Sequence, residues 1–127
     1  MISALSAKIQ KVTKSFIYAF QGLLSAVKVE TNLKIHLFTT VIVLLVSVWL
    51  SLSMIEWLFI LIAIGGVIAL ELLNTAVERV VDLVTEEYHP LAKQAKDIAA
   101  GAVLVYAFLA VVIGLFIFLP KLLKLLN

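Results

Sequence analysis

The sequence predicts an all-α membrane protein in which an amphipathic helix at the membrane interface precedes three transmembrane helices. Three observations predict this fold. Apolar residues make up 64% of the 127 residues and charged residues 14%, whereas soluble proteins have about 45–50% and about 25%. The mean hydropathy is +1.18, and a chain this short has too little interior to bury so many apolar side chains. Several uncharged stretches approach the roughly 20 helical residues that cross a bilayer.

Length and composition also exclude several classes of protein. A chain of 127 residues has room for a single domain. A net charge of +2 is too small for the positively charged surface of a nucleic-acid-binding protein. The absence of cysteine excludes disulfides, thiolate metal sites and cysteine nucleophiles.

Residues 8–28 have the pattern of a helix that lies in the membrane interface. Their apolar residues fall within an arc of about 80° on a helical wheel; these are Ile9, Val12, Phe16, Phe20, Leu23 and Val27. Four lysines lie outside the arc, which gives the helix a basic opposite face. The alternative is a cleaved signal peptide, but the first 28 residues contain no compact apolar block.

Three transmembrane helices are predicted at about residues 33–55, 57–85 and 91–119. The first contains 19 uncharged residues, 37–55, and the third contains 23, 98–120. The second contains an uncharged run over 57–70 and has polar residues only toward its end. Pro120 is expected to stop the third helix, because proline disrupts helical hydrogen bonding.

The distribution of lysine and arginine predicts the orientation in the membrane. Eight of the ten lie before the first span or between the second and third, whereas the turn at 51–56 has none and the tail has only Lys121 and Lys124. The positive-inside rule therefore places the N-terminus and the segment 79–96 in the cytoplasm. Seven of the eight acidic residues lie at the same face, and Glu56 alone lies on the outer side. This polar plane is the predicted active site.

Four polar residues of the second span share one helix face. Glu71, Asn74, Glu78 and Asp82 follow one another at spacings of three or four residues. Glu71 comes after 14 uncharged residues, and an ionisable residue at that depth indicates a functional site. Carboxylate and amide oxygens on one stripe suit a hard cation such as Mg²⁺. For Asp82, the alternative is an ordinary solvated helix face.

Two more polar clusters lie at the same depth. In segment 30–36, the alternative to a functional role is an ion pair between Glu30 and Lys34. In segment 93–97, Lys96 lies near the start of the third span, where an ammonium group suits phosphate; the alternative is a membrane anchor. Carboxylates, a lysine and a divalent ion are the minimal set for phosphoryl transfer. The glycines form none of the phosphate-binding loops of soluble kinases.

The run from Glu71 to Asp82, followed by Glu87-Tyr88-His89 and by Ala95-Lys96-Asp97, resembles the signature of the small prokaryotic diacylglycerol and undecaprenol kinases. The resemblance covers nearly the whole chain, including the order of an interfacial helix and three spans. It implies a homotrimeric helical bundle that transfers phosphate from Mg²⁺-ATP to a lipid alcohol. It also implies that each site is shared between neighbouring subunits.

The resemblance further implies roles for individual residues. Glu71 is the general base for the lipid hydroxyl, and Asn74 and Ala100 contact the lipid substrate. Glu30 and Glu78 hold Mg²⁺ against the phosphates. The ATP site comprises Lys11, Tyr18, Glu30, Glu78, Glu87, Tyr88, His89, Lys96 and Asp97. Lys11 and Lys34 stand where relatives carry arginine, and lysine lacks the bidentate geometry of a guanidinium group.

Segments 30–36 and 96–101 resemble the undecaprenol kinases of Gram-positive bacteria more than the diacylglycerol kinases of Gram-negative bacteria. The predicted substrate is therefore undecaprenol, with diacylglycerol as the alternative, at the bacterial cytoplasmic membrane. A different class is a small proton-coupled transporter built around Glu71, although transporter sites usually lie near the bilayer midplane. A scaffold that only packs helices through Ala92, Ala95, Ala99 and Ala102 would leave the buried acids unexplained.

Overall fold

The computed structural model describes the backbone of residues 2–126 and the side chains of residues 6–126. Its four helices are α1 (Ile2–Val29), α2 (Thr31–Trp49), α3 (Met54–Val84) and α4 (Pro90–Leu126). The last three are long and apolar enough to cross a membrane. The predicted all-α membrane fold is therefore confirmed, with α1 longer than predicted because it begins at Ile2.

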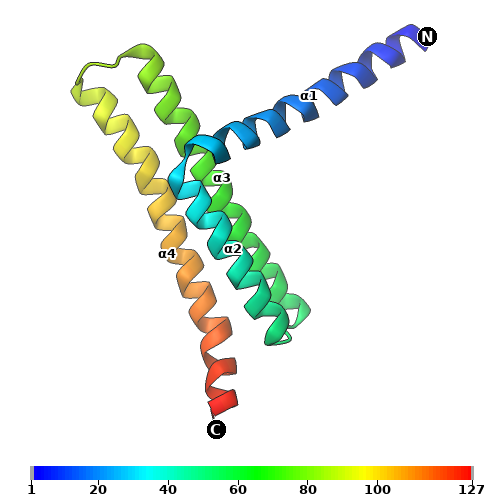
Figure 1. Cartoon of the computed structure of the whole chain (residues 1–127), viewed down its shortest axis with the longest axis vertical. Helices are drawn as coiled ribbons and strands as arrows, with labels where there is room; N and C mark the ends of the chain where they lie inside the picture. Colours follow the sequence, from blue (N-terminus) through cyan, green and yellow to red (C-terminus); the bar gives the residue numbers. More distant parts are fainter. Residues whose placement is uncertain (1, 127) are drawn as a thin grey trace.

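Helix α1 stands apart from the other three helices. It projects away from them at a steep angle, whereas α2, α3 and α4 run alongside one another (Figure 1). The change of direction occurs at Glu30, which has an extended backbone with φ −85° and ψ 118°. The apolar stripe of α1 remains exposed; Phe16, for example, is 74% exposed. The C-terminal part of α1 does contact α3, where Arg79 donates to the Ser25 hydroxyl at 3.2 Å. A projecting helix with an exposed apolar stripe and a basic opposite face is suited to the membrane interface.

A tight turn ends α2 earlier than the predicted residue 55. Ser51 adopts a positive φ of 50°, and Ser53 then caps α3. The Ser53 hydroxyl accepts from the Glu56 backbone N–H at 3.4 Å, and the Ser53 N–H donates to the Glu56 carboxylate at 2.7 Å. This capping box satisfies two backbone donors of the new helix, so the chain reverses at residues 50–53 although the sequence there is uncharged.

The expectation that Pro120 ends the third span is wrong. Helix α4 continues through Pro120 to Leu126. Proline removes one backbone donor, and the helix beyond it is still held to α3, because Lys121 forms an ion pair with Glu56 at 3.1 Å.

Helix α3 lies at the centre of the bundle, with α2 and α4 on its two sides. Its buried face includes Ile60, Ala63 and Val67, which recur at helical spacing. Close approach of α3 and α4 occurs at Gly66, where an added Cβ would overlap the ring of Tyr106. The Tyr106 hydroxyl donates to the backbone oxygen of Ile62 at 3.2 Å, which fixes the ring over the glycine.

This contact makes Gly66 a sensitive position for packing. We expect Gly66→Ala to displace the Tyr106 ring and to lower the free energy of unfolding by about 1–3 kcal/mol, as overpacking does. Gly65→Ala is the matched control, because a Cβ there meets nothing within 4 Å and alanine favours the helix by up to about 1 kcal/mol. Denaturant titration of both variants in mixed micelles measures the difference. Equal stabilities would contradict the packing argument.

Candidate active site

The centre of the site is a buried polar stripe on α3. Glu71 is 3% exposed, Asn74 8% and Thr75 3%. They continue the face that carries Val67, since residues three or four positions apart lie above one another on a helix. Burying a carboxylate is costly unless it is paired, and no ion pair involves Glu71 among the described residues. A buried carboxylate that lowers stability indicates a functional role rather than a packing role.

Asn74 has one satisfied and one unsatisfied polar atom. Its Nδ2 donates to the Glu78 carboxylate at 3.0 Å. Its Oδ1 is buried and has no hydrogen-bond partner within the described part of the chain. Buried polar atoms are nearly always paired, so this oxygen is available to a ligand that brings a donor or a cation.

Glu71 is surrounded by ionisable groups from two helices. The ionisable neighbours that influence it are His36, Glu30 and Glu78. Glu30 is the residue before α2, and its side chain makes no capping hydrogen bond. The carboxylates of Glu30 and Glu78 thus lie close enough to Glu71 to influence it electrostatically. The Thr75 hydroxyl donates to the Glu71 backbone oxygen at 3.0 Å, so it makes its bond within the helix.

The alternative ion pair between Glu30 and Lys34 is not formed. Lys34 Nζ instead donates to the backbone oxygen of Lys28 at 3.0 Å. This contact caps the end of α1, because the last carbonyl groups of a helix lack partners within it. The Glu30 carboxylate therefore stays available to a ligand.

A second polar group lies where α3 passes into α4. A pocket of about 340 Å³ opens there. Its polar lining residues are Asp82, Thr85, Glu86, Glu87, Tyr88, His89, Lys93 and Lys96. Lys96 forms an ion pair with Asp82, and Lys93 forms one with Asp97. The structure thus brings together the predicted ATP-binding residues Glu87, Tyr88, His89 and Lys96, with Asp97 held beside them through Lys93.

Asp82 has the exposure expected of the solvated helix face offered as its alternative. Its side chain is 57% exposed, as on a solvated helix face, and it is also paired with Lys96 across the α3–α4 hairpin. Glu78 lies one turn earlier on α3. The polar stripe of α3 therefore leads toward the hairpin pocket, to which Asp82 contributes.

Three predicted site residues are not brought to these groups within one chain. Lys11 and Tyr18 lie on the exposed length of α1, which points away from the bundle (Figure 1). Ala100 is exposed on α4, one turn beyond Lys96. None of the three lines either pocket in the described structure.

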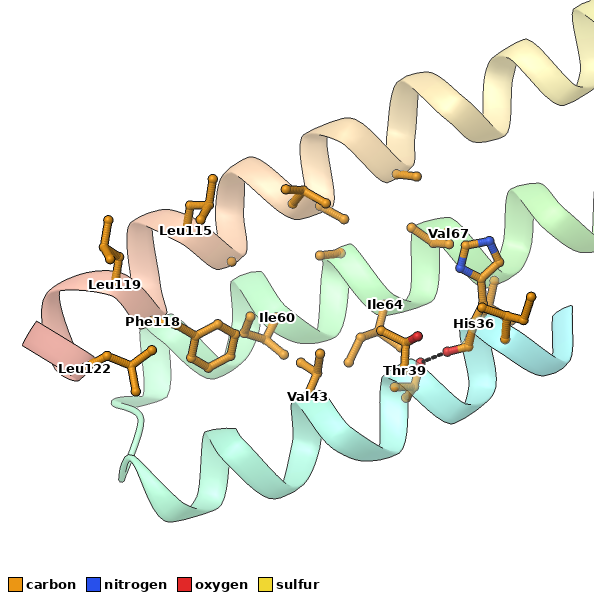
Figure 2. A pocket seen from close by; sticks show the side chains of 18 residues that line it. His36, Thr39, Val43, Ile60, Ile64, Val67, Leu115, Phe118, Leu119 and Leu122 are labelled. Atoms are coloured by element: carbon orange, nitrogen blue, oxygen red, sulfur yellow. Dashed lines mark hydrogen bonds between the residues drawn. The ribbon is translucent and has the colours of Figure 1, made fainter. Parts of the chain in front are cut away.

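The structure also contains an apolar groove that sequence reasoning missed. It has a volume of about 530 Å³ and lies between α2 and α4, with α3 as its floor. Figure 2 shows His36 at one end of this groove and Leu122 at the other. The available signal was the row of small residues Ala107, Ala110 and Gly114 on α4, which leaves space beside α3.

The residues present are compatible with a magnesium ion. Within the described residues no three acidic or histidine side chains converge closely enough to hold a metal by themselves. Mg²⁺ needs fewer protein ligands than three, because it usually takes one or two carboxylates and completes its coordination shell with phosphate and water. Glu30 and Glu78 supply two carboxylates near an unpaired amide oxygen, that of Asn74.

Comparison with known proteins gives a consistent result. The family model described as prokaryotic diacylglycerol kinase matches residues 17–118. The chain is 48% identical over 115 residues to the undecaprenol kinase of Bacillus subtilis, covering 91% of this chain and 94% of that protein. It is 47% identical over 112 residues to a diacylglycerol kinase of Synechocystis, covering 87% of this chain and 64% of that protein. It is 29% identical over 102 residues to the diacylglycerol kinase of Escherichia coli, covering 80% of this chain and 84% of that protein.

These relatives are named as kinases of lipid alcohols, which favours a lipid kinase over the transporter and scaffold alternatives. The family model spans the polar stripe of α3, the α3–α4 hairpin and most of the three spans. The chain belongs to the prokaryotic diacylglycerol kinase family.

Proposed function

We propose that the protein phosphorylates undecaprenol with ATP at the cytoplasmic face of the bacterial membrane. The observation that carries this proposal is the buried Glu71 carboxylate on the same helix face as the Asn74 oxygen, which has no partner among the described residues; Glu71 follows the groove residue Val67 by one turn. Such an arrangement suits an acceptor with one hydroxyl on a hydrocarbon body. The Bacillus relative's name supports undecaprenol as the acceptor, and diacylglycerol is the alternative. The clustering of lysines before α2 and around the α3–α4 hairpin supports the cytoplasmic orientation.

The chain's own residues account for the movement of the hydroxyl proton. The lipid hydroxyl first donates a hydrogen bond to Asn74 Oδ1, which has no partner among the residues that the structure describes. As the alcohol oxygen bonds to the γ-phosphorus, the proton passes to the Glu71 carboxylate and the bond to the leaving ADP breaks. A positioned base of this kind contributes about 10²–10⁴-fold to the rate.

Glu30 and Glu78 would hold Mg²⁺ together with the phosphates of ATP. When bound, the ion neutralises negative charge on the phosphates. The hydrogen bond from Asn74 Nδ2 to Glu78 orients that carboxylate. Glu30 lies between α1 and α2, and its side chain makes no capping hydrogen bond. The carboxylate can therefore turn toward the same ligand.

The hairpin pocket is the proposed ATP site. Lys96 contacts phosphate as a cationic donor, and Glu87, Tyr88, His89 and Asp97 complete the pocket. Lys11 and Tyr18 lie on the projecting α1, so they would reach the ATP site of a neighbouring subunit. Ala100 likewise would contact lipid across a subunit boundary. The many exposed apolar residues of α2, α3 and α4 are consistent with a homotrimer that covers part of them.

Phosphate transfer from labelled ATP tests the proposal directly. Purified protein in detergent receives Mg²⁺ and ATP labelled at the γ-phosphate, with undecaprenol or diacylglycerol offered in parallel. We expect labelled undecaprenyl phosphate to form fastest, and we expect EDTA to abolish transfer. Equal turnover of the two lipids would contradict the assignment of undecaprenol as the substrate. Transfer of phosphate to neither lipid would contradict the proposed lipid-kinase activity.

The ion pair between Asp82 and Lys96 gives a second test. Asp82→Asn should change the free energy of unfolding by less than about 1 kcal/mol, because exposed ion pairs contribute little. Lys96→Met should raise the KM for ATP about tenfold, because a charged contact to phosphate is lost. Lys124→Met is the control, since Lys124 lies near the far end of α4. An unchanged KM in the Lys96 variant would contradict its role in phosphate binding.

A further inference from the structure

The end of α1 is fastened to α3 by a hydrogen bond between side chains. Arg79 Nη1 donates to the Ser25 hydroxyl at 3.2 Å, although the two residues lie 54 positions apart in the sequence. Both residues are exposed, and Arg79 forms no ion pair within the described part of the chain. Among the described residues, this is the single side-chain hydrogen bond that joins α1 to α3.

A second hydrogen bond holds the same end of α1 to α2. Lys34 Nζ donates to the backbone oxygen of Lys28 at 3.0 Å, and Lys28 lies one turn beyond Ser25 on α1. Ala26, between them in the sequence, is only 4% exposed. The last turns of α1 therefore pack against the bundle, whereas the rest of the helix projects from it (Figure 1).

These contacts adjoin the two proposed magnesium ligands. Glu30 directly follows the end of α1, and its backbone N–H donates to the Ala26 oxygen at 2.8 Å. Arg79 directly follows Glu78 on α3. The bond made by Arg79 therefore holds α1 against α3 next to both carboxylates, and it limits how far the two carboxylates can separate.

The same contacts set the direction of the projecting part of α1. Lys11 lies 14 positions before Ser25, which is about 21 Å along a helix that rises 1.5 Å per residue. Over that length, a tilt of about 10° moves Lys11 by about 4 Å, which is more than the length of a hydrogen bond. A small loosening at the end of α1 is therefore enough to separate Lys11 from a bound phosphate.

We propose that Arg79 is a positioning residue for ATP binding, which fixes the direction of α1 through its bond to Ser25. In this role it keeps the Glu30 carboxylate near that of Glu78, and it directs the projecting part of α1 toward the ATP site of a neighbouring subunit. The inference rests on the proposed lipid-kinase function and adds to it the residue pair that orients α1. Arg79 itself does not touch the nucleotide. Its charge strengthens the bond to the hydroxyl, because charged donors make stronger hydrogen bonds than neutral ones.

Two variants separate the hydrogen bond from the charge of Arg79. Arg79→Met removes both, whereas Ser25→Ala removes the bond and leaves the guanidinium group in place. Each should raise the KM for ATP about three- to tenfold, as expected for the loss of one exposed hydrogen bond, with the KM for the lipid unchanged. The kcat at saturating ATP should change less than the KM, because bound nucleotide can draw α1 back into position. The double variant should be no worse than Arg79→Met alone, since both changes remove the same contact.

Ser25→Thr and Ser15→Ala are the matched controls. Threonine keeps the hydroxyl that accepts from Arg79, and the Ser15 hydroxyl donates within α1 to the Lys11 backbone oxygen at 3.0 Å, so both variants should keep the wild-type KM for ATP. A raised KM in Arg79→Met but not in Ser25→Ala would mean that the charge contacts phosphate directly, and would overturn the positioning role. A lower kcat in both variants with an unchanged KM would indicate only a loss of folded protein, and would overturn it as well.

A distance measurement tests the direction of α1 without any phosphate transfer. The chain contains no cysteine, so spin labels can be attached through Gln10→Cys and Leu83→Cys, at exposed positions of α1 and α3. With labelled chains diluted in an excess of unlabelled chains in lipid nanodiscs, pulsed electron paramagnetic resonance measures the distance between the two labels of one chain. We expect a narrow distance distribution with the bond intact, and a broader or shifted one with Arg79→Met or Ser25→Ala. An unchanged distribution in both variants would overturn the proposal, whether or not the kinase assay succeeds.

Discussion

Glu71→Gln is expected to lower kcat for phosphate transfer by about 10²–10⁴-fold, the usual contribution of a positioned general base. Glutamine has nearly the same shape but cannot accept the hydroxyl proton. Its burial costs less than that of a carboxylate, because an unpaired buried charge is expensive. The variant should therefore be at least as stable as the wild-type protein while being far less active. Initial rates with saturating ATP and lipid, together with denaturant titration in micelles, measure both quantities.

Glu56→Gln is the matched control for this experiment. It makes the same chemical change on the same helix, but Glu56 caps the other end of α3 and pairs with Lys121. Its kcat should stay near the wild-type value while its stability falls slightly. Full activity of the Glu71→Gln protein would contradict the proposal that Glu71 is the general base. Proton-driven uptake into sealed vesicles without ATP would instead support the alternative function as a proton-coupled transporter.

Asn74→Leu should have the next largest effect, a loss of about 10²–10³-fold in kcat, comparable to the removal of one preorganised polar contact from an active site. Leucine has a similar volume but provides neither the free Oδ1 nor the donor that holds Glu78 at 3.0 Å. Both the orientation of the lipid hydroxyl and that of a proposed magnesium ligand would be lost. Steady-state kinetics over a range of Mg²⁺ concentrations distinguish the two, since misplacement of Glu78 should also raise the Mg²⁺ requirement.

Thr75→Val is the control for Asn74. Thr75 is equally buried and adjacent in sequence, but its hydroxyl donates to a backbone oxygen of its own helix. Its replacement should change kcat only a few-fold. If both variants lost activity equally, the effect of Asn74 would be one of packing, and its proposed contact with the lipid hydroxyl would be wrong.

Much of the site was visible in the sequence because helical periodicity is local. A spacing of three or four residues puts Glu71, Asn74 and Glu78 on one face in any helix, and the structure shows that face buried around Glu71 and Asn74. The hairpin residues were predictable for a similar reason, since a short connection between long helices brings Glu87 to His89 close to the start of α4. The signature formed by these residues was also enough to indicate the family.

Other features depended on contacts between distant residues and were not predictable from spacing. The sequence suggested a partner for Lys34 four residues away, yet Lys34 bonds the backbone at Lys28. Lys96 pairs with Asp82 fourteen positions earlier, which depends on how α3 and α4 align. Pro120 was expected to end its helix, but α4 continues to Leu126, and Lys121 in the turn that follows pairs with Glu56 of α3.

A helical membrane protein with a polar plane at one end was predictable from the sequence, because hydrophobic length and charge placement act residue by residue. Three features required the packed helices: the groove that α2 and α4 leave beside α3, the position of His36 at one end of it, and the buried Asn74 oxygen, which has no partner among the described residues. Those features depend on how closely helices approach, which small residues such as Gly66 and Ala110 control from separate helices. Interhelical distance is a property of pairs of surfaces, so it emerges only when the helices are packed together.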